Sequence, residues 1–218
     1  AGGAPIAMVS MDNCAQNGKK LQDGVLAVAR GWQERELVPA AFLDWLENPA
    51  CVSFPWSMID KITPHPSERV KEALEGLGLA DMTISKTNTG TLIAPFVNTE
   101  ITEYLVLEDA FPNGRPALEK AGVYLTDRTT EEEAEKMKVG TCLNPLHTAL
   151  AVYGCLLGYT SISAEMGDPD LRALVEHIAE ESLPVVEDPG ILSPRAFIDE
   201  VLNERFPNPA IPDTPQRI

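Results

Sequence analysis

The chain has 218 residues, of which 44% are hydrophobic and 23% charged, and this composition is ordinary for a globular protein of one large or two small domains. It carries 33 acidic against 17 basic residues, and a net charge of -16 argues against nucleic acid or anionic lipid as a partner. No apolar run reaches the roughly 18 residues of a membrane span, and the first residues form no basic leader. Four scattered cysteines without C-x-x-C spacing predict a cytoplasmic protein without a disulfide framework or a zinc site.

The first part of the chain mixes short strands with amphipathic helices. Residues 5–11 form an apolar run that ends at Asp12 and Asn13, as a buried strand does. Asn17-Gly18 then opens a long helix with apolar residues at 21, 25, 28 and 32. The next predicted elements are a helix over 37–46, a strand over 51–54 and a helix over 66–77.

The pattern changes between residues 83 and 108. Short β-type runs over 91–97 and 101–107 alternate with turn residues, which predicts a small antiparallel sheet. F-P-N-G-R-P at 111–116 predicts a turn, and a strand over 123–125 comes after it.

Helix signals mark the stretch 130–157 and the rest of the chain beyond it. Thr130 with Glu133 predicts a capping box, Gly140 a stop, and Asn144 before a proline a new helix with Asn144 as N-cap. This second helix is apolar almost all round, so we expect it to be buried. Two further helices are predicted to begin at Asp168-Pro169 and Ser193-Pro194, and the proline-rich end at 205–218 to be extended.

Three polar residues of this stretch, Lys138, Asn144 and His147, are therefore expected inside the protein, near a helix break. A desolvated lysine gives up its proton more readily and can act as a general acid or base. The simpler readings are a solvated lysine paired with Glu135, an asparagine that only caps a helix, and a hydrogen-bonded core histidine. The residue types alone leave these alternatives open.

Other sequence signals exclude more than they identify. The chain has no G-x-G-x-x-G or P-loop sequence, no nucleophile elbow, and no histidine spacing typical of a metal site. Asp12 and Asn13 lie just after a strand, where ligands bind in open α/β sheets, but both are also common turn residues. Asp60 and Lys61 are consistent with a simple ion pair.

Six motifs follow one another along the chain. They are S-M-D-N-x-x-x-N-G (10–18), F-P-W-S-M-I-D-K-I-T-P (54–64), E-D-x-F-P-N-G-R-P (108–116), E-x-x-K (135–138), L-N-x-x-H-x-A-L (143–150) and R-F-x-N-P-x-I-x-D-x-x-x-R (205–217). They cover nearly the whole chain, which makes the set far more specific than any one of them. In this order they resemble the mannitol dehydrogenase family of long-chain polyol and hexuronate dehydrogenases, and within it the fructuronate reductases most.

The resemblance implies an NAD-dependent oxidoreductase that interconverts D-fructuronate and D-mannonate without a metal. Lys138 would be the general acid/base, while Asn13 and Asn144 would hold the carbonyl oxygen as it gains alkoxide character. Glu135 would tune the lysine or gate its proton path. The residues implied for substrate hydroxyls are Asp60, His147 and Arg217, and those for a substrate carboxylate are Arg217 and Lys61.

The resemblance also implies the domain organisation. Residues 1–110 would be the end of a Rossmann-type dinucleotide-binding domain with a small antiparallel sheet, and 111–218 a mainly α-helical substrate domain. We therefore expect a fragment of a longer protein, whose NAD is bound mainly by a domain outside this chain. Asp12 and Asn13 are the candidates for cofactor contact within it. Alone, the chain is expected neither to bind NADH tightly nor to turn over.

Three departures from the family pattern keep alternatives open. N-P-L-H stands for the usual N-G-S-H, Lys61 stands for an arginine, and one extra residue separates Lys138 from Asn144. On a straight helix that spacing sets the two about 240° apart, so a break at Gly140 or a π-bulge is needed for convergence. The alternatives are a mannitol 2-dehydrogenase, a tagaturonate reductase, or a non-catalytic helical interaction domain of the same ancestry.

Overall fold

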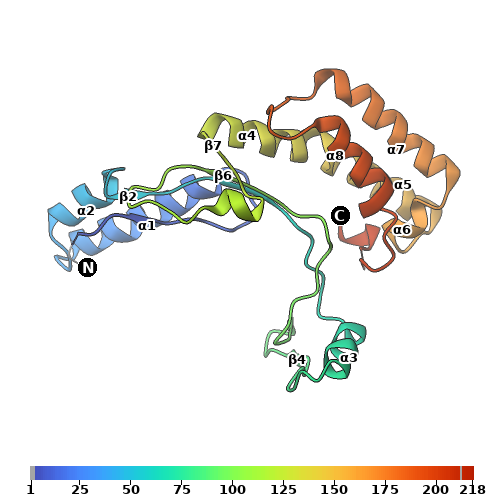
Figure 1. The fold of residues 1–218 in the computed structure, drawn as a ribbon, viewed down its shortest axis with the longest axis horizontal. Coiled ribbons are helices and arrows are strands. Elements are labelled where there is room, and N and C mark those ends of the chain that lie inside the picture. The colour runs from blue at the N-terminus through green and yellow to red at the C-terminus, as the bar shows by residue number, and fades with distance from the viewer. Residues whose placement is uncertain (1–2, 212) are drawn as a thin grey trace.

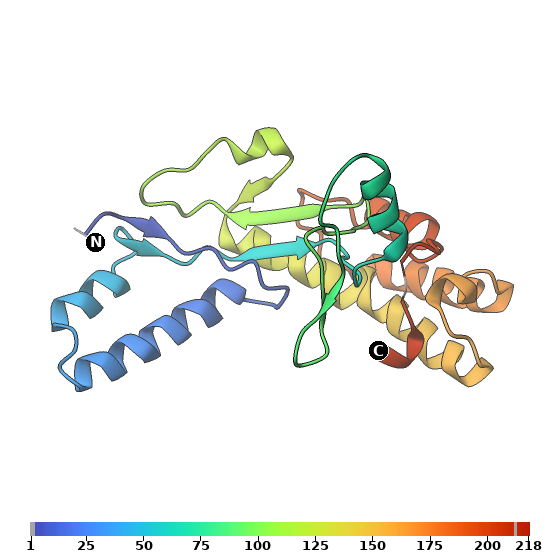
Figure 2. The same ribbon diagram turned by 90° about the horizontal axis from the view of Figure 1, so that it is seen from below.

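The computed structural model describes residues 3–211 and 213–218, except for the side chain of Arg217, so the predicted role of Arg217 lies outside the described residues. Figure 1 shows three parts: a small lobe with α1 (Asn17–Glu34) and α2 (Ala40–Glu47), a larger helical part, and an arm that projects between them. Figure 2 shows how the central strands run from the small lobe to the helical part.

The small lobe is built on a two-stranded parallel pair, β1 (Ile6–Ala7) with β2 (Val52–Ser53). Both predicted strands are confirmed but shorter than expected, because in the described residues each finds only the other to pair with. The apolar faces of α1 and α2 close a separate small core over this pair. That core consists of Leu26, Ala29, Leu46, Val52 and Phe54.

A close approach fixes the start of α1. A Cβ on Gly18 would lie 2.6 Å from the carbonyl oxygens of Phe54 and Pro55, so only glycine lets the helix pass here. Next to it, the buried Asn17 amide accepts a hydrogen bond from Ser57 N at 3.0 Å and donates to Ser57 O at 2.8 Å. These contacts join the first residue of α1 to the first residue of the central sheet.

The central sheet is three-stranded and mixed, in the order β3 (Ser57–Asp60), β6 (Tyr104–Glu108), β7 (Tyr124–Thr126). β3 pairs antiparallel with β6, and β6 pairs parallel with β7. Both runs of the predicted antiparallel sheet, 91–97 and 101–107, contain strands in antiparallel pairs, but the two runs lie in different sheets. The first run instead gives β5 (Leu92–Ile93), which pairs with β4 (Ser85–Lys86) in the arm, beyond α3 (Glu68–Gly76).

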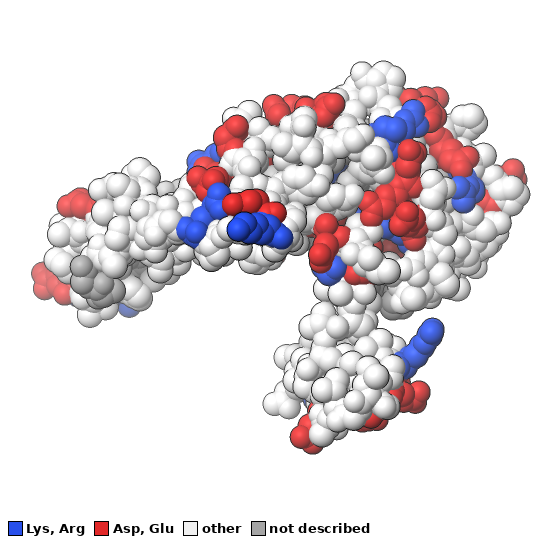
Figure 3. All heavy atoms as spheres, in the orientation of Figure 1, with Lys and Arg blue, Asp and Glu red and all other residues white. Residues whose placement is uncertain are grey.

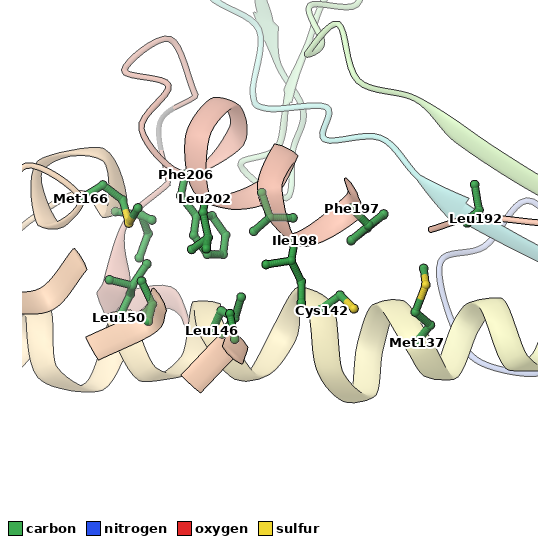
Figure 4. Close-up of a cluster of buried hydrophobic side chains, with 14 of the residues drawn as sticks. Met137, Cys142, Leu146, Leu150, Met166, Leu192, Phe197, Ile198, Leu202 and Phe206 are labelled. Atoms are coloured by element: carbon green, nitrogen blue, oxygen red, sulfur yellow. The ribbon is translucent and has the colours of Figure 1, made fainter. Parts of the chain in front are cut away.

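One continuous helical rod carries the centre of the helical part. It consists of α4 (Arg128–Met137), the π-turn η2 (Lys138–Cys142) and α5 (Asn144–Leu157). Its buried side chains face α8 (Pro194–Glu200) and a second π-turn, η4 (Val201–Arg205), as Figure 4 shows. The remaining elements are η1 (Leu118–Ala121), α6 (Ile162–Glu165), α7 (Pro169–Ser182), η3 (Leu183–Val185) and η5 (Pro215–Arg217).

Several predicted helix ends need correction. The capping box at Thr130 is wrong, because Asp127 is the N-cap and its carboxylate accepts from Thr130 N at 3.0 Å. Gly140 does not end the helix, which widens into a π-turn instead, and Leu143 rather than Asn144 occupies the N-cap position of α5. The predicted caps Asp168 and Ser193 are confirmed.

The prediction that α5 is buried all round is also wrong. Its buried face carries Leu146, Leu150, Ala151 and Gly154, whereas Val152, Tyr153, Leu156 and Leu157 are exposed in this chain. In the view of Figure 3 the carboxylates gather over the central and helical parts, while the visible face of the lobe with α1 and α2 carries few charged side chains. Among the described helices, none has both the length and the apolarity that crossing a membrane requires.

Candidate active site

A cavity of about 550 Å³ lies where the loop after β1, the end of β3, the rod and the C-terminal segment meet. It brings together residues up to two hundred positions apart in the sequence. Asp12 does not line it, and the backbone carbonyl of that residue instead accepts a hydrogen bond from Asn17, as in a turn. The predicted site residues that line the cavity are Asn13, Asp60, Lys61, Glu135, Lys138, Asn144 and His147.

Lys138 is buried, with 3% of its surface exposed, so the reading of a solvated helix lysine is wrong. Its Nζ donates to the carbonyl oxygen of Ile59 at 2.5 Å and to Oδ1 of Asn13 at 3.2 Å. The amine is thus held between the end of β3 and the loop after β1. It still borders the cavity, where a ligand oxygen can reach it.

The π-turn solves the problem of the extra residue between Lys138 and Asn144. Leu143 N donates to the carbonyl oxygen of Lys138 at 3.0 Å, a bond between residues five apart that defines a π-helix. A π-turn takes up one more residue than an α-turn, so the residues after it return to the faces they would occupy without the insertion. Lys138, Asn144 and His147 therefore border one cavity.

Asn144 lies exposed at the first turn of α5, on the cavity wall, so the expectation that it is buried inside the protein is wrong. Within the part of the chain that the structure describes, its side-chain amide makes no hydrogen bond, and it does not cap the helix. An amide in this position is available to a ligand. Asn13, by contrast, already uses its oxygen on Lys138, which orients the NH₂ group of the same amide away from that amine.

Asp60 is buried, and its carboxylate is bound by Arg205. Its two oxygens accept from Nη1 and Nη2 of Arg205 at 2.6 and 2.9 Å, and Lys138 Nζ lies 3.8 Å from Oδ1. Arg205 also donates to Glu100 at 2.9 and 3.1 Å. The simple ion pair between Asp60 and Lys61 is therefore wrong, since each has a different partner.

Lys61 borders the cavity but is bound to the base of the arm. Its Nζ donates to Glu103 Oε2 at 2.9 Å and to the carbonyl oxygen of Glu100 at 3.0 Å. A substrate carboxylate would have to compete with Glu103, whose side chain is largely exposed. Exposed ion pairs of this kind contribute about 1 kcal/mol or less, so such an exchange is inexpensive.

His147 is oriented by two residues from the C-terminal segment. Its Nε2 lies 2.6 Å from Oδ2 of Asp213, and its ring stacks on Phe206 with the centroids 5.5 Å apart. These contacts fix the plane of the imidazole at the cavity wall. The reading of a core histidine is wrong, because the ring is partly exposed to the cavity.

Glu135 lies on the last turn of α4, facing Lys138. Burial, with the negative charge of Asp60 added, raises the pKa of Glu135, while the Lys138 charge opposes the shift. One turn earlier, burial together with the charges of Glu135 and Glu108 raises the pKa of Glu131 to about 7. The face of α4 that leads to Lys138 thus carries two carboxyl groups that bind a proton more readily than usual.

Sequence reasoning assigned no role to Arg205, Phe206 or Asp213, although all three border the cavity. All three lie within the motif over 205–217 that forms part of the family resemblance. This motif could therefore have pointed to the three residues as candidates for the site. A motif alone does not show which of its residues face the cavity.

The chain is similar to known dehydrogenases over its whole length. Residues 132–218, which include the rod from Glu132 onward and the C-terminal segment, match the mannitol dehydrogenase C-terminal domain. Over its whole length the chain is 58% identical to the D-mannonate oxidoreductase of Thermotoga maritima and 33% identical to the mannitol 2-dehydrogenase of Cereibacter sphaeroides. The chain belongs to the mannitol dehydrogenase family. It spans about 40% of the length of the curated relatives it matches.

Solved structures of the family share the fold. The chain superposes on a substrate-free crystal structure of D-sorbitol dehydrogenase with a TM-score of 0.79 at 28% identity, covering 97% of this chain and 39% of that one. For the Pseudomonas fluorescens mannitol 2-dehydrogenase in complex with NAD and D-mannitol, the TM-score is 0.66 at 32% identity, with 97% and 38% covered. The prediction of small sheets followed by a mainly helical second half is thus confirmed for this chain, and the D-sorbitol dehydrogenase structure has a similar fold.

Proposed function

We propose that the protein carrying this chain is an NAD-dependent oxidoreductase that interconverts D-fructuronate and D-mannonate. The observation that carries the proposal is the convergence of Lys138, Asn13 and Asn144 on one cavity despite the extra residue in the helix. The 58% identity to a D-mannonate oxidoreductase supports this substrate pair over the other sugars of the family.

In the proposed reaction Lys138 delivers a proton to the carbonyl oxygen of the keto sugar, and takes it back in the reverse direction. Its contacts with Ile59 O and Asn13 leave the amine fixed in place, so little reorganisation is needed. The side-chain amides of Asn13 and Asn144 donate hydrogen bonds to that oxygen as negative charge builds on it. A preorganised donor of this kind is worth about 3 kcal/mol, and of the two amides Asn13 is already held in place by its bond to Lys138.

The raised pKa values of Glu135 and Glu131 suit a path by which Lys138 regains its proton after each turnover. His147, oriented by Asp213, binds a substrate hydroxyl, and Lys61 or Arg217 pairs with the substrate carboxylate. Asp60 acts beside Lys138 rather than by binding a hydroxyl directly, because both its oxygens accept from Arg205.

NAD fits the remaining features of the chain. Asn13 comes after β1 at the carboxyl end of a parallel strand pair, which is where cofactors bind in open α/β sheets. When bound, the cofactor supplies the hydride. Most of its binding domain is proposed to lie outside this chain, and residues 1–110 and 111–218 are proposed as the end of that domain and the substrate domain.

Mannitol 2-dehydrogenase activity is the second candidate, because a relative with that name is 33% identical over the whole chain. Tagaturonate reduction and a non-catalytic role are the other outcomes of the test. The full-length protein is mixed with NADH and, in turn, fructuronate, tagaturonate and fructose, and the loss of NADH absorbance is monitored. Turnover of fructuronate alone supports the proposal, and turnover of fructose alone contradicts it.

Lys138→Ala separates an enzyme from a binding domain. We expect it to lower kcat by at least a thousandfold, because proton transfer and the positioned amine are both lost. Lys136→Ala, on the exposed face of the same helix, is the matched control and should leave kcat unchanged. Equal activity of both variants would rule out the lysine mechanism.

A further inference from the structure

Each of the two π-turns carries a positively charged side chain that lies close to the carboxylate of Asp60. Lys138 is the first residue of η2 and Arg205 is the last residue of η4. Between them lies Asp60, 2.6 Å from Arg205 Nη1 and 3.8 Å from Lys138 Nζ. Asp60 is therefore much more tightly bound to the arginine than to the lysine.

The charges in this cluster balance. Lys138, Arg205, Asp60 and Glu100 are all buried, with 3%, 4%, 4% and 8% of their surface exposed, and two of them are positive and two negative. The guanidinium of Arg205 also lies 6.0 Å from the centre of the Phe197 ring. Buried charges are stable only when paired and hydrogen-bonded, so the removal of one member leaves a partner uncompensated.

We propose that Arg205 is a positioning residue that acts on Lys138 through Asp60. By binding both oxygens of Asp60, the arginine prevents this carboxylate from closing onto the amine of Lys138 as a direct ion pair. The amine is thereby left to the Ile59 carbonyl and to Asn13, on the side of the cavity. The inference rests on the proposed function, in which Lys138 exchanges a proton with the substrate.

The physical consequence concerns how tightly Lys138 holds its proton. Without Arg205, the full negative charge of Asp60 acts on the ammonium at short range in a poorly solvated site. The other carboxyl group that faces the lysine is Glu135 on α4, and Glu100 would become uncompensated as well. An opposite charge at this distance moves the titration of a group by roughly one to three pH units. For the Lys138 ammonium beside the Asp60 carboxylate the titration moves to higher pH.

The test uses the full-length protein with Arg205→Gln, and with Arg205→Gln combined with Glu100→Gln. The double variant removes one positive and one negative charge, so it keeps the buried site neutral and guards against a failure to fold. Arg205→Lys keeps the positive charge but loses the bidentate hydrogen bonding to Asp60. Arg195→Gln, which changes an exposed arginine on α8, is the matched control.

Two readouts separate this inference from the proposed function. The first is an NMR titration of the ¹³Cε-labelled lysine side chains, with the Lys138 signal assigned from Lys138→Arg. The second is the pH profile of kcat for the oxidation of the sugar alcohol. Only the second requires that the protein be a dehydrogenase.

We expect both profiles to move to higher pH by about one unit or more in the two Arg205→Gln variants. In Arg205→Lys both profiles should move less than in the Arg205→Gln variants, and in Arg195→Gln they should not move. Folded variants with an unmoved Lys138 titration would overturn the inference. A moved titration in a protein that oxidises none of the sugar alcohols would uphold the link between Arg205 and Lys138 and refute the proposed function alone.

Discussion

The carboxyl group of Glu165 fills the space that Gly154 leaves on α5. A Cβ added to this glycine would lie 1.8 Å from Oε1 and 2.1 Å from Cδ of Glu165. Glu165 has 0% of its surface exposed, and neither carboxyl oxygen has a hydrogen-bond partner among the described residues. The helix thus makes room for an acid group two turns along from His147.

Replacing Gly154 by alanine should destabilise the protein. At 1.8 Å the carboxyl group of Glu165 must move, and because this side chain is fully buried we expect the overpacking to cost about 1–3 kcal/mol. Thermal unfolding of the variant measures the effect. Gly31→Ala on α1, where nothing lies within 4 Å, is the control and should raise the melting temperature slightly. Equal stability of both variants would contradict the packing described here.

Glu165→Gln should make stability less dependent on pH. Burial, with the charge of Asp213 added and that of His147 opposing, raises the pKa of Glu165 to about 7. Since the usual value is 4.5, the folded state holds the proton more tightly than the unfolded one. The stability that this group contributes is thus complete below pH 4.5 and is lost as the pH rises through 7.

The glutamine variant should therefore match the parent protein at low pH and exceed it at pH 8, by on the order of 1 kcal/mol. Urea unfolding at a series of pH values measures this. Glu181→Gln, an exposed change on α7, is the control and should run parallel to the parent. A constant difference between Glu165→Gln and the parent at all pH values would mean that Glu165 does not titrate in this range.

Gly18→Ala should disturb both the fold and the site. The new methyl group would lie 2.6 Å from two carbonyl oxygens of the segment before β3, and α1 must then move off. We expect a loss of about 2 kcal/mol in stability and a lower kcat, because the loop with Asn13 ends at this helix. Gly24→Ala on the same helix has open space and should be neutral or slightly stabilising. Denaturant unfolding and initial rates of both variants check the prediction.

Asp213→Asn should weaken substrate binding more than turnover. The change leaves the shape of the segment intact but removes the charge that orients His147 at 2.6 Å. We expect KM to rise about tenfold, which corresponds to about 1.4 kcal/mol, with kcat within a few-fold of the parent. Steady-state kinetics distinguishes these terms. A large fall in kcat at unchanged KM would instead give His147 a part in the chemical step.

The order of the elements could be read from the sequence because it depends on local signals. The caps Asp168 and Ser193 and the amphipathic pattern of α1 are examples. Strand pairing could not be read in the same way. β6 has the same pattern whether it joins β5 or β3, and the choice depends on the tertiary position of the arm.

Seven of the residues that line the candidate site were predictable, but Arg205, Phe206 and Asp213 were not, and neither was the geometry of the site. The resemblance named Lys138 and Asn144, and their spacing required a helix break or a π-bulge. Packing favours the π-turn, which places Met137, Cys142 and Leu146 in one core. The bond from Arg205 to Asp60 joins residues 145 positions apart, and no local pattern encodes it.

The arm is closed at its base by two sets of bonds. The Asn98 amide bridges His65 O and Ser67 N, each at 3.2 Å, and nearer the sheet Glu100 accepts from Ile62 N at 2.7 Å. The two ends of the arm are thus fastened to each other where the chain leaves the cavity wall. The part of the arm beyond these bonds is a suitable place to graft a tag, a probe or a foreign loop. The bonds at the base limit how far a change there can displace the residues of the cavity.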